Sequence, residues 1–161
     1  MKEINDVLGE IGKRNGLDMA LDENGACTLE LADGRVMLIQ ERAEMDEVDF
    51  VATIGQVPEE VRAEVFTELL AANFYWKETL GATISWNADL DEAVIMYPLA
   101  LSGATDVSVE TIFTRFVELQ SVWADRLSGL VAAAQERYGE EPGEDDEGDA
   151  GEGDSDLIIK A

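Results

Sequence analysis

Apolar residues recur at helical spacing near the start of the chain. The apolar positions are Ile4, Val7, Leu8 and Ile11. Their separations of three and four residues predict an amphipathic helix from about Lys2 to Arg14. The Asn-Gly pair that follows tolerates the left-handed backbone of a helix C-terminus, so we expect the helix to end there.

Three strands are predicted next, because the apolar positions change to a spacing of two. The first strand contains Cys27 and Leu29, and it leads into an Asp-Gly pair that is typical of a hairpin turn. The second is apolar on both faces over 36–39, so both faces need a packing partner. The third covers 48–54 and places Phe50 and Ile54 on one face. Three consecutive strands indicate an antiparallel meander.

A second helix is expected from Pro58 to about Trp76, since proline suits a first helical turn. Its apolar residues cover a wider arc than one sheet contact requires, which suggests two partners, one of them another subunit. Two further strands follow over 82–86 and 93–99, the second ended by Pro98, which cannot donate to a ladder. A last helix starts near Ser108, a plausible N-cap, and runs to about residue 138.

The predicted order is therefore α-β-β-β-α-β-β-α. Regular βαβ alternation is missing from this order, which favours an α+β domain with helices packed on a twisted antiparallel sheet.

Charge divides the chain into two parts. It has 36 acidic and 11 basic residues, a formal net charge of -25, although 46% of its residues are hydrophobic. Ten acidic residues lie in 139–156; this leaves 26 acidic and ten basic residues in 1–138, a net charge of -16. Residues 1–138 are predicted to form one domain, and 139–161 an acidic, disordered tail with an apolar end at Leu157–Ile159.

The residues that usually provide general-base catalysis, metal binding and phosphate binding are missing from the sequence. The chain has no histidine, the commonest general base and metal ligand, and no glycine-rich phosphate loop. The turn carboxylates Asp89, Asp91 and Asp22 do not fit a calcium-binding loop, and the single cysteine, Cys27, is interpreted as a buried thiol. We expect no catalysis, no metal, no cofactor and no nucleic-acid binding.

No signal-peptide pattern and no apolar run of about 20 residues occurs, so a cytoplasmic protein without membrane insertion is expected.

One family resemblance is carried by modest motifs over residues 1–131. These are Leu69-Leu70-Ala71-Ala72-Asn73, Gly81-Ala82, a strand ending in Tyr97-Pro98-Leu99, and a helix with Phe116-Val117 and Trp123-Ala124-Asp125-Arg126-Leu127. The pattern resembles the CesT/Tir chaperone family, the class I chaperones of bacterial type III secretion. The acidic tail is longer than the family's usual ending, so no role is carried over to it.

The resemblance implies a homodimer that binds the N-terminal segment of one or more secreted effectors. It would keep that segment extended and deliver it to the export apparatus, with the export ATPase as a further candidate partner. The implied effector groove comprises Ile4, Val7, Leu8, Met37, Ile39 and Val51. The implied dimer interface comprises Val65, Phe66, Leu69, Ile84 and Trp86. Core packing is the alternative role for each residue in both sets.

Two other functions stay open at this point. The first is a regulatory adaptor of the same fold that sequesters another chaperone or a transcription regulator. The second is an acidic mimic of nucleic acid, whose binding would depend strongly on salt.

Overall fold

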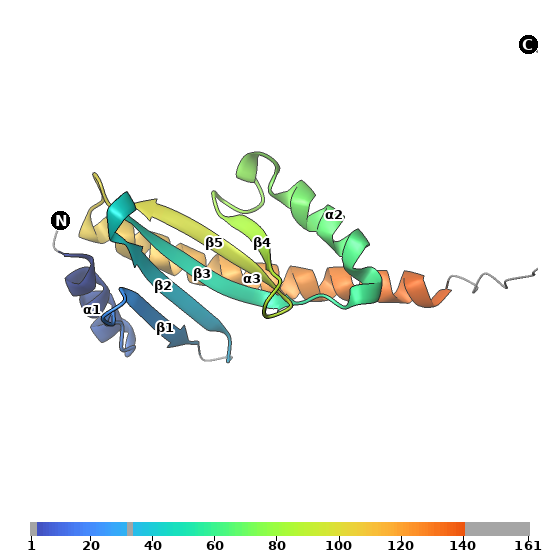
Figure 1. The fold of residues 1–161 in the computed structure, drawn as a ribbon, viewed down its shortest axis with the longest axis horizontal. Coiled ribbons are helices and arrows are strands. Elements are labelled where there is room, and N and C mark those ends of the chain that lie inside the picture. Colours follow the sequence, from blue (N-terminus) through green and yellow to red (C-terminus); the bar gives the residue numbers. More distant parts are fainter. Residues whose placement is uncertain (1–2, 32–33, 141–161) are drawn as a thin grey trace, which may run out of the picture.

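The computed structural model describes residues 3–31 and 34–140 and shows an α+β fold (Figure 1). Its elements are α1 (Ile4–Asn15), β1 (Ala26–Glu30), β2 (Val36–Arg42), β3 (Glu47–Gln56), α2 (Arg62–Ala72), β4 (Thr83–Asn87), β5 (Glu92–Ala100) and α3 (Asp106–Glu140). Short 3-10 helices occupy Ala43–Met45, Glu59–Val61 and Phe74–Trp76. The predicted fold class and order of elements are confirmed. The first two residues of the predicted tail continue α3, and the rest lies outside the described residues.

The five strands form one antiparallel sheet in the order β1-β2-β3-β5-β4. The predicted meander β1-β2-β3 is present, whereas β4 crosses over β5 to the edge of the sheet. One row across the sheet joins Leu38, Val51 and Met96, and the adjacent row joins Met37, Ala52 and Ile95. Because side chains alternate along each strand, these two rows point to opposite faces.

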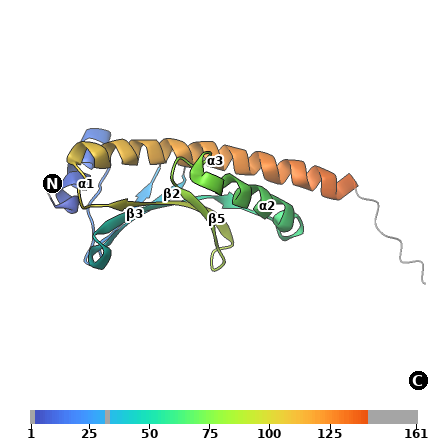
Figure 2. The ribbon, with the colours of Figure 1, turned by 90° about the horizontal axis from the view of Figure 1, so that it is seen from above.

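All three α-helices lie on one face of the sheet, and within the described residues no α-helix lies on the other face (Figure 2). The core is between these layers, where the Phe50 ring contacts Phe113 and Phe116 of α3 at centroid distances of 6.4 and 5.9 Å. With 35 residues, α3 is about 52 Å long, so its second half continues past the strands beside α2 (Figure 2). The sheet therefore has a packed face and an open face.

The second helix is shorter than predicted. Instead of continuing to Trp76, α2 ends at Ala72, and Tyr75 has a positive φ of 56° inside the following 3-10 turn. The cause is Asn73, whose side-chain amide donates to the Ile84 carbonyl at 3.0 Å and accepts from the Ile84 N–H at 2.9 Å. This pair of bonds gives the outer edge of β4 a side-chain partner in place of a neighbouring strand.

Two predicted boundaries in the second half of the chain are also wrong. Ser108 is not the N-cap of α3, because the helix begins at Asp106. The Thr105 N–H donates to the Ser108 hydroxyl at 2.8 Å, and the Ser108 N–H donates to the Thr105 hydroxyl at 3.1 Å. Pro98 does not end β5, because β4 pairs with β5 only up to Met96. A residue without an N–H donor is tolerated on such an unpaired edge.

Candidate partner-binding surfaces

The open face of the sheet carries an apolar row at its centre. Leu38, Val51 and Met96 are neighbours on β2, β3 and β5, and all three are half-buried. Val36, two positions before Leu38 on the same face, is 43% exposed. Since no helix covers this face in Figure 2, the row is available to a molecule that lies across the sheet.

Charged residues border one end of this row. Arg42 lies on the same face as Leu38, and its guanidinium contacts Glu47 at 2.8 Å and Asp49 at 2.7 Å. Two carboxylates share one cation here, so the cluster keeps a net negative charge. A partner segment with a basic residue beside its apolar residues would complement this end of the face.

Five of the six residues predicted for the effector groove lie in the core. Their exposed fractions are 5% for Ile4, 1% for Val7 and 0% for Leu8, Met37 and Ile39. The three residues of α1 point toward the sheet, and Met37 and Ile39 share the helix-covered face with Phe50. These five side chains therefore pack in the core of the chain.

Val51 differs from the other five, because it lies on the open face. It pairs with Leu38 and Met96, two residues that the sequence analysis did not single out. The alternation of side chains along β2 could have identified Leu38, because Met37 and Ile39 share one face and Leu38 must lie on the opposite face. The sequence could not say which of the two faces the helices cover.

A second surface lies where α2 meets the edge strand β4. The rings of Phe66 and Trp86 contact each other at a centroid distance of 5.0 Å, and the Arg62 guanidinium lies 4.7 Å from the centre of the Trp86 ring. A shallow apolar depression of about 110 Å³ lies between these elements and includes Leu70. Leu70 and Phe74 are 70% and 74% exposed.

The residues predicted for a dimer interface divide between core and surface. Val65, Leu69 and Ile84 are at most 5% exposed and pack within the chain, which makes them support for this surface. Phe66 and Trp86 are half-buried and reach its floor. The exposed Leu70, Phe74 and Tyr75 complete it, although the sequence analysis did not include them in the interface.

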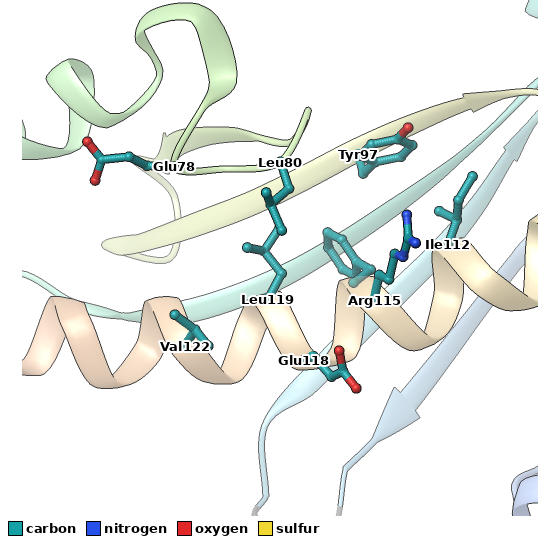
Figure 3. A pocket seen from close by; sticks show the side chains of 9 residues that line it. Glu78, Leu80, Tyr97, Ile112, Arg115, Glu118, Leu119 and Val122 are labelled. Carbon is teal, nitrogen blue, oxygen red and sulfur yellow. The ribbon is translucent and has the colours of Figure 1, made fainter.

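A third feature is a groove beside α3, over the part of β5 that β4 does not flank (Figure 3). Its volume is about 710 Å³. Leu80 and Leu119 point toward one another across it, and Arg115 points from α3 toward β5 (Figure 3). Its remaining lining residues are Glu78, Tyr97, Ile112, Phe116, Glu118 and Val122.

Two of the carboxylates considered for a metal site, Asp22 and Asp91, have structural partners. Asp22 accepts hydrogen bonds from the N–H groups of Ala26 and Asn24 at 2.9 and 2.8 Å, and these bonds lower the pKa of its carboxyl group. Asp91 contacts Arg62 at 2.9 Å. Within residues 3–31 and 34–140, no group of three potential ligand residues lies close enough together to hold a metal ion.

Cys27 is 5% exposed and has no disulfide partner. Burial, together with the nearby carboxylates of Asp18 and Asp22, raises the pKa of its thiol. A neutral thiol in this position packs as a small apolar residue.

Among the described helices, none combines the length and apolar character that crossing a membrane requires.

A comparison with family models identifies the relatives of this chain. The model of the Tir chaperone protein (CesT) family matches residues 6–124. The chain belongs to the CesT family. The matched range extends from α1 to the middle of α3, so it includes the open sheet face, the α2 surface and the groove beside α3. Comparison with curated proteins gives no match.

Solved structures show the same fold in other proteins. A chain of the ExsC-ExsE complex matches 78% of this CesT-family chain and 93% of its own length, with a TM-score of 0.68 and 18% identity. A chain of the ExoU-SpcU heterodimer from the type III secretion system of Pseudomonas aeruginosa matches 80% and 97%, with a TM-score of 0.58 and 17% identity.

A third match is to the structure of the Yersinia pestis type III secretion chaperone SycH with a fragment of YscM2. It covers 74% of this chain and 98% of that one, with a TM-score of 0.55 and 14% identity. The fold is thus that of type III secretion chaperones, as the sequence resemblance implied.

Proposed function

We propose that this chain is a type III secretion chaperone that binds the N-terminal segment of one or more effectors. It keeps that segment extended and delivers it to the export apparatus, where the export ATPase is a candidate contact. The observation that carries the proposal is the apolar row Leu38, Val51 and Met96 on an uncovered sheet face of a CesT-family chain.

The open face suits an extended peptide better than a folded domain. Its apolar row is one residue wide on each of three adjacent strands, and the ion-pair cluster of Arg42, Glu47 and Asp49 limits it at one end. Apolar side chains of an extended or helical segment could replace water over this row, and each fully buried large side chain would contribute about 1.5–3 kcal/mol. Binding of this kind requires neither ATP nor catalysis by the chaperone.

The acidic body supports the same function. A net charge of -16 over residues 1–138 keeps molecules with an exposed apolar face apart and so opposes their aggregation. It also accelerates the approach of partner segments that carry basic residues. We place the protein in the cytoplasm, where such segments await export.

A second copy of the chain is proposed as a further partner. Leu70, Phe66 and Trp86 line one apolar depression, and the exposed, mutually contacting rings of Phe74 and Tyr75 follow at the end of α2. Contact between this surface and the same surface of a second copy would form a two-fold dimer. Asn73 already occupies the backbone groups of Ile84, so helix faces supply this contact in preference to a continuous ladder from β4 to β4.

Binding of an effector segment can be measured by titration calorimetry with effector N-terminal peptides encoded near this gene. We expect Leu38→Asp and Val51→Asp to weaken binding at least tenfold, because each places a charge in the apolar row. Val107→Asp is the matched control, since Val107 is 72% exposed at the start of α3, which lies on the opposite side of the sheet from the row. Val51→Thr keeps the side-chain shape and tests whether a loss reflects folding.

The control outcomes separate the alternatives. Equal affinity of all four variants would exclude the open face as the binding surface, and insolubility of the effector on co-expression would exclude the chaperone function. Capture of a folded regulator in place of an effector segment would identify the adaptor alternative. Loss of binding at moderate salt would indicate electrostatic mimicry of nucleic acid.

A further inference from the structure

The groove beside α3, of about 710 Å³, is left unused by the proposed effector and dimer surfaces. It lies on the helix-covered side of the sheet, so an effector segment on the open face would not fill it. Two of its lining residues, Leu80 and Val122, are 69% and 60% exposed, although both are apolar. The groove therefore presents apolar side chains to solvent at a place where nothing in 3–31 or 34–140 covers them.

The segment 78–81 is fixed in a conformation that leaves part of the β5 edge beside the groove unpaired by β4. Leu80 has a φ of 52° and Gly81 a φ of 94°, and these values turn the chain away before it could extend β4 along the rest of β5. The Trp123 indole N–H also bonds to the Glu78 carbonyl at 3.3 Å, and Arg126 pairs with the Glu78 carboxylate. The segment that carries Leu80 is thus fixed to α3 while the β5 edge at Tyr97 stays unpaired by β4.

We propose that the apolar segment Leu157–Ile159 of this same chain docks into the groove beside α3 and covers Leu80 and Val122. This segment has three large aliphatic residues in succession, after 16 residues (141–156) that contain nine carboxylates and no large apolar side chain. Its composition matches the apolar lining of the groove.

Chain length permits this contact. Val122 precedes the end of α3 by 18 residues, which places it about 27 Å along the helix from Glu140. Sixteen residues with random-coil statistics have a root-mean-square span of about 20–24 Å, and like charges extend such a chain further. The tether therefore reaches the groove without being fully stretched.

The positive charge of Arg115 in the groove complements the negative charges that precede the apolar segment. Arg115 lines the groove and has no ion pair or hydrogen bond within the described part of the chain. Asp154 and Asp156 immediately precede the apolar segment and can reach its guanidinium once that segment is seated. Two acidic residues, Glu78 and Glu118, also line the groove. The Glu78 carboxylate is paired with Arg126, and the Glu118 carboxylate is directed away from Leu80 and Tyr97 (Figure 3).

Attachment to the same chain favours this occupant over an unlinked peptide. Three apolar residues bind weakly by themselves, but covalent attachment through a short linker raises their effective concentration to about millimolar values. Pro98 removes one N–H donor from the neighbouring edge, so side-chain burial in the groove, more than a backbone ladder, would hold the segment. Docking would shield Leu80 and Val122 from other molecules.

Paramagnetic relaxation in the full-length chain tests the proposal. A nitroxide is attached through Ser155→Cys, and Cys27 escapes labelling because it is 5% exposed. We expect at least a twofold loss of amide signal at Leu80, Arg115 and Val122, with little loss at Leu38 on the open face. Loss spread evenly over the surface, or centred on the open face, would overturn the proposal.

Matched variants identify the contact. Replacing Leu157, Ile158 and Ile159 together by serine, or Val122 by aspartate, should abolish the local signal loss, while Val107→Asp should preserve it.

Mixing nitroxide-labelled chains with isotope-labelled, nitroxide-free chains should give no loss of amide signal, and a loss at the groove would assign the contact to a second copy instead. Effector affinity of the triple serine variant is measured in parallel, because the proposed chaperone function survives if this variant binds effector normally.

Discussion

At the scale of single residues, the Asn73 side chain determines where α2 ends. Apolar spacing continues through Phe74 and predicts more helix, yet the amide of Asn73 bonds both backbone groups of Ile84 at 2.9 and 3.0 Å. These bonds satisfy an edge strand that would otherwise expose its N–H and C=O groups. Ending α2 here also leaves Phe74 and Tyr75 on the surface.

We expect Asn73→Ala to lower the free energy of unfolding by about 1–3 kcal/mol, because both Ile84 groups lose their partner. Asn73→Asp should also destabilise, since a carboxylate can accept from the Ile84 N–H but cannot donate to its carbonyl. Urea denaturation and hydrogen exchange of the Ile84 amide provide the measurements. Lys77→Ala, an exposed change in the same segment, serves as the control. Unchanged stability and exchange in Asn73→Ala would show that the two bonds contribute nothing.

At the scale of elements, the packing of α3 against β3 depends on a shift of strand register within β3. The register between β3 and β5 shifts between Thr53 and Gly55, and the amide of the fully buried Gln120 donates to the Thr53 carbonyl at 3.0 Å. Gly55 has a φ of 140°, and a Cβ there would lie 3.2 Å from Leu127 Cδ2. The positive φ and the close approach of Leu127 therefore favour glycine at this position.

Two glycine substitutions on this unit should act in opposite directions. Gly55→Ala is expected to destabilise by about 1–3 kcal/mol, because an L-residue is strained at this φ and Leu127 must move. Gly129→Ala should stabilise by about 0.5–1 kcal/mol, since this helical position has nothing within 4 Å and alanine favours helix. Thermal or urea unfolding measures both. Destabilisation by Gly129→Ala would contradict an open environment at that position of α3.

At the scale of the whole molecule, three apolar surfaces lie in different places. The row Leu38, Val51 and Met96 is on the open face, Leu70 and Phe74 are beside β4, and the groove with Leu80 lies beside α3. Their separation allows an effector, a second copy and the chain's own apolar segment to bind together. The net charge of -25 keeps such a molecule soluble in the absence of partners.

The proposed dimer surface is tested by Leu70→Glu combined with Phe74→Glu. Placing two carboxylates on a self-complementary apolar patch brings four into one two-fold interface, so we expect the dissociation constant to rise at least a hundredfold. Light scattering and sedimentation over a concentration series measure the mass. Leu90→Glu, at an exposed site in the β4–β5 turn, should remain dimeric. A wild-type protein that stays monomeric at high concentration, or a double variant that dimerises normally, would exclude this interface.

The sequence by itself determined the fold class, the order of elements and the family, because spacings of two and of three to four residues depend only on local backbone geometry. It also identified the residues that are apolar. Only the tertiary structure decided which of them are covered: Met37 and Ile39 are fully buried, while Leu38 and Val51 lie on the open face. Strand periodicity distinguishes two faces without saying which one the helices occupy, and that choice depends on contacts between residues far apart in the chain.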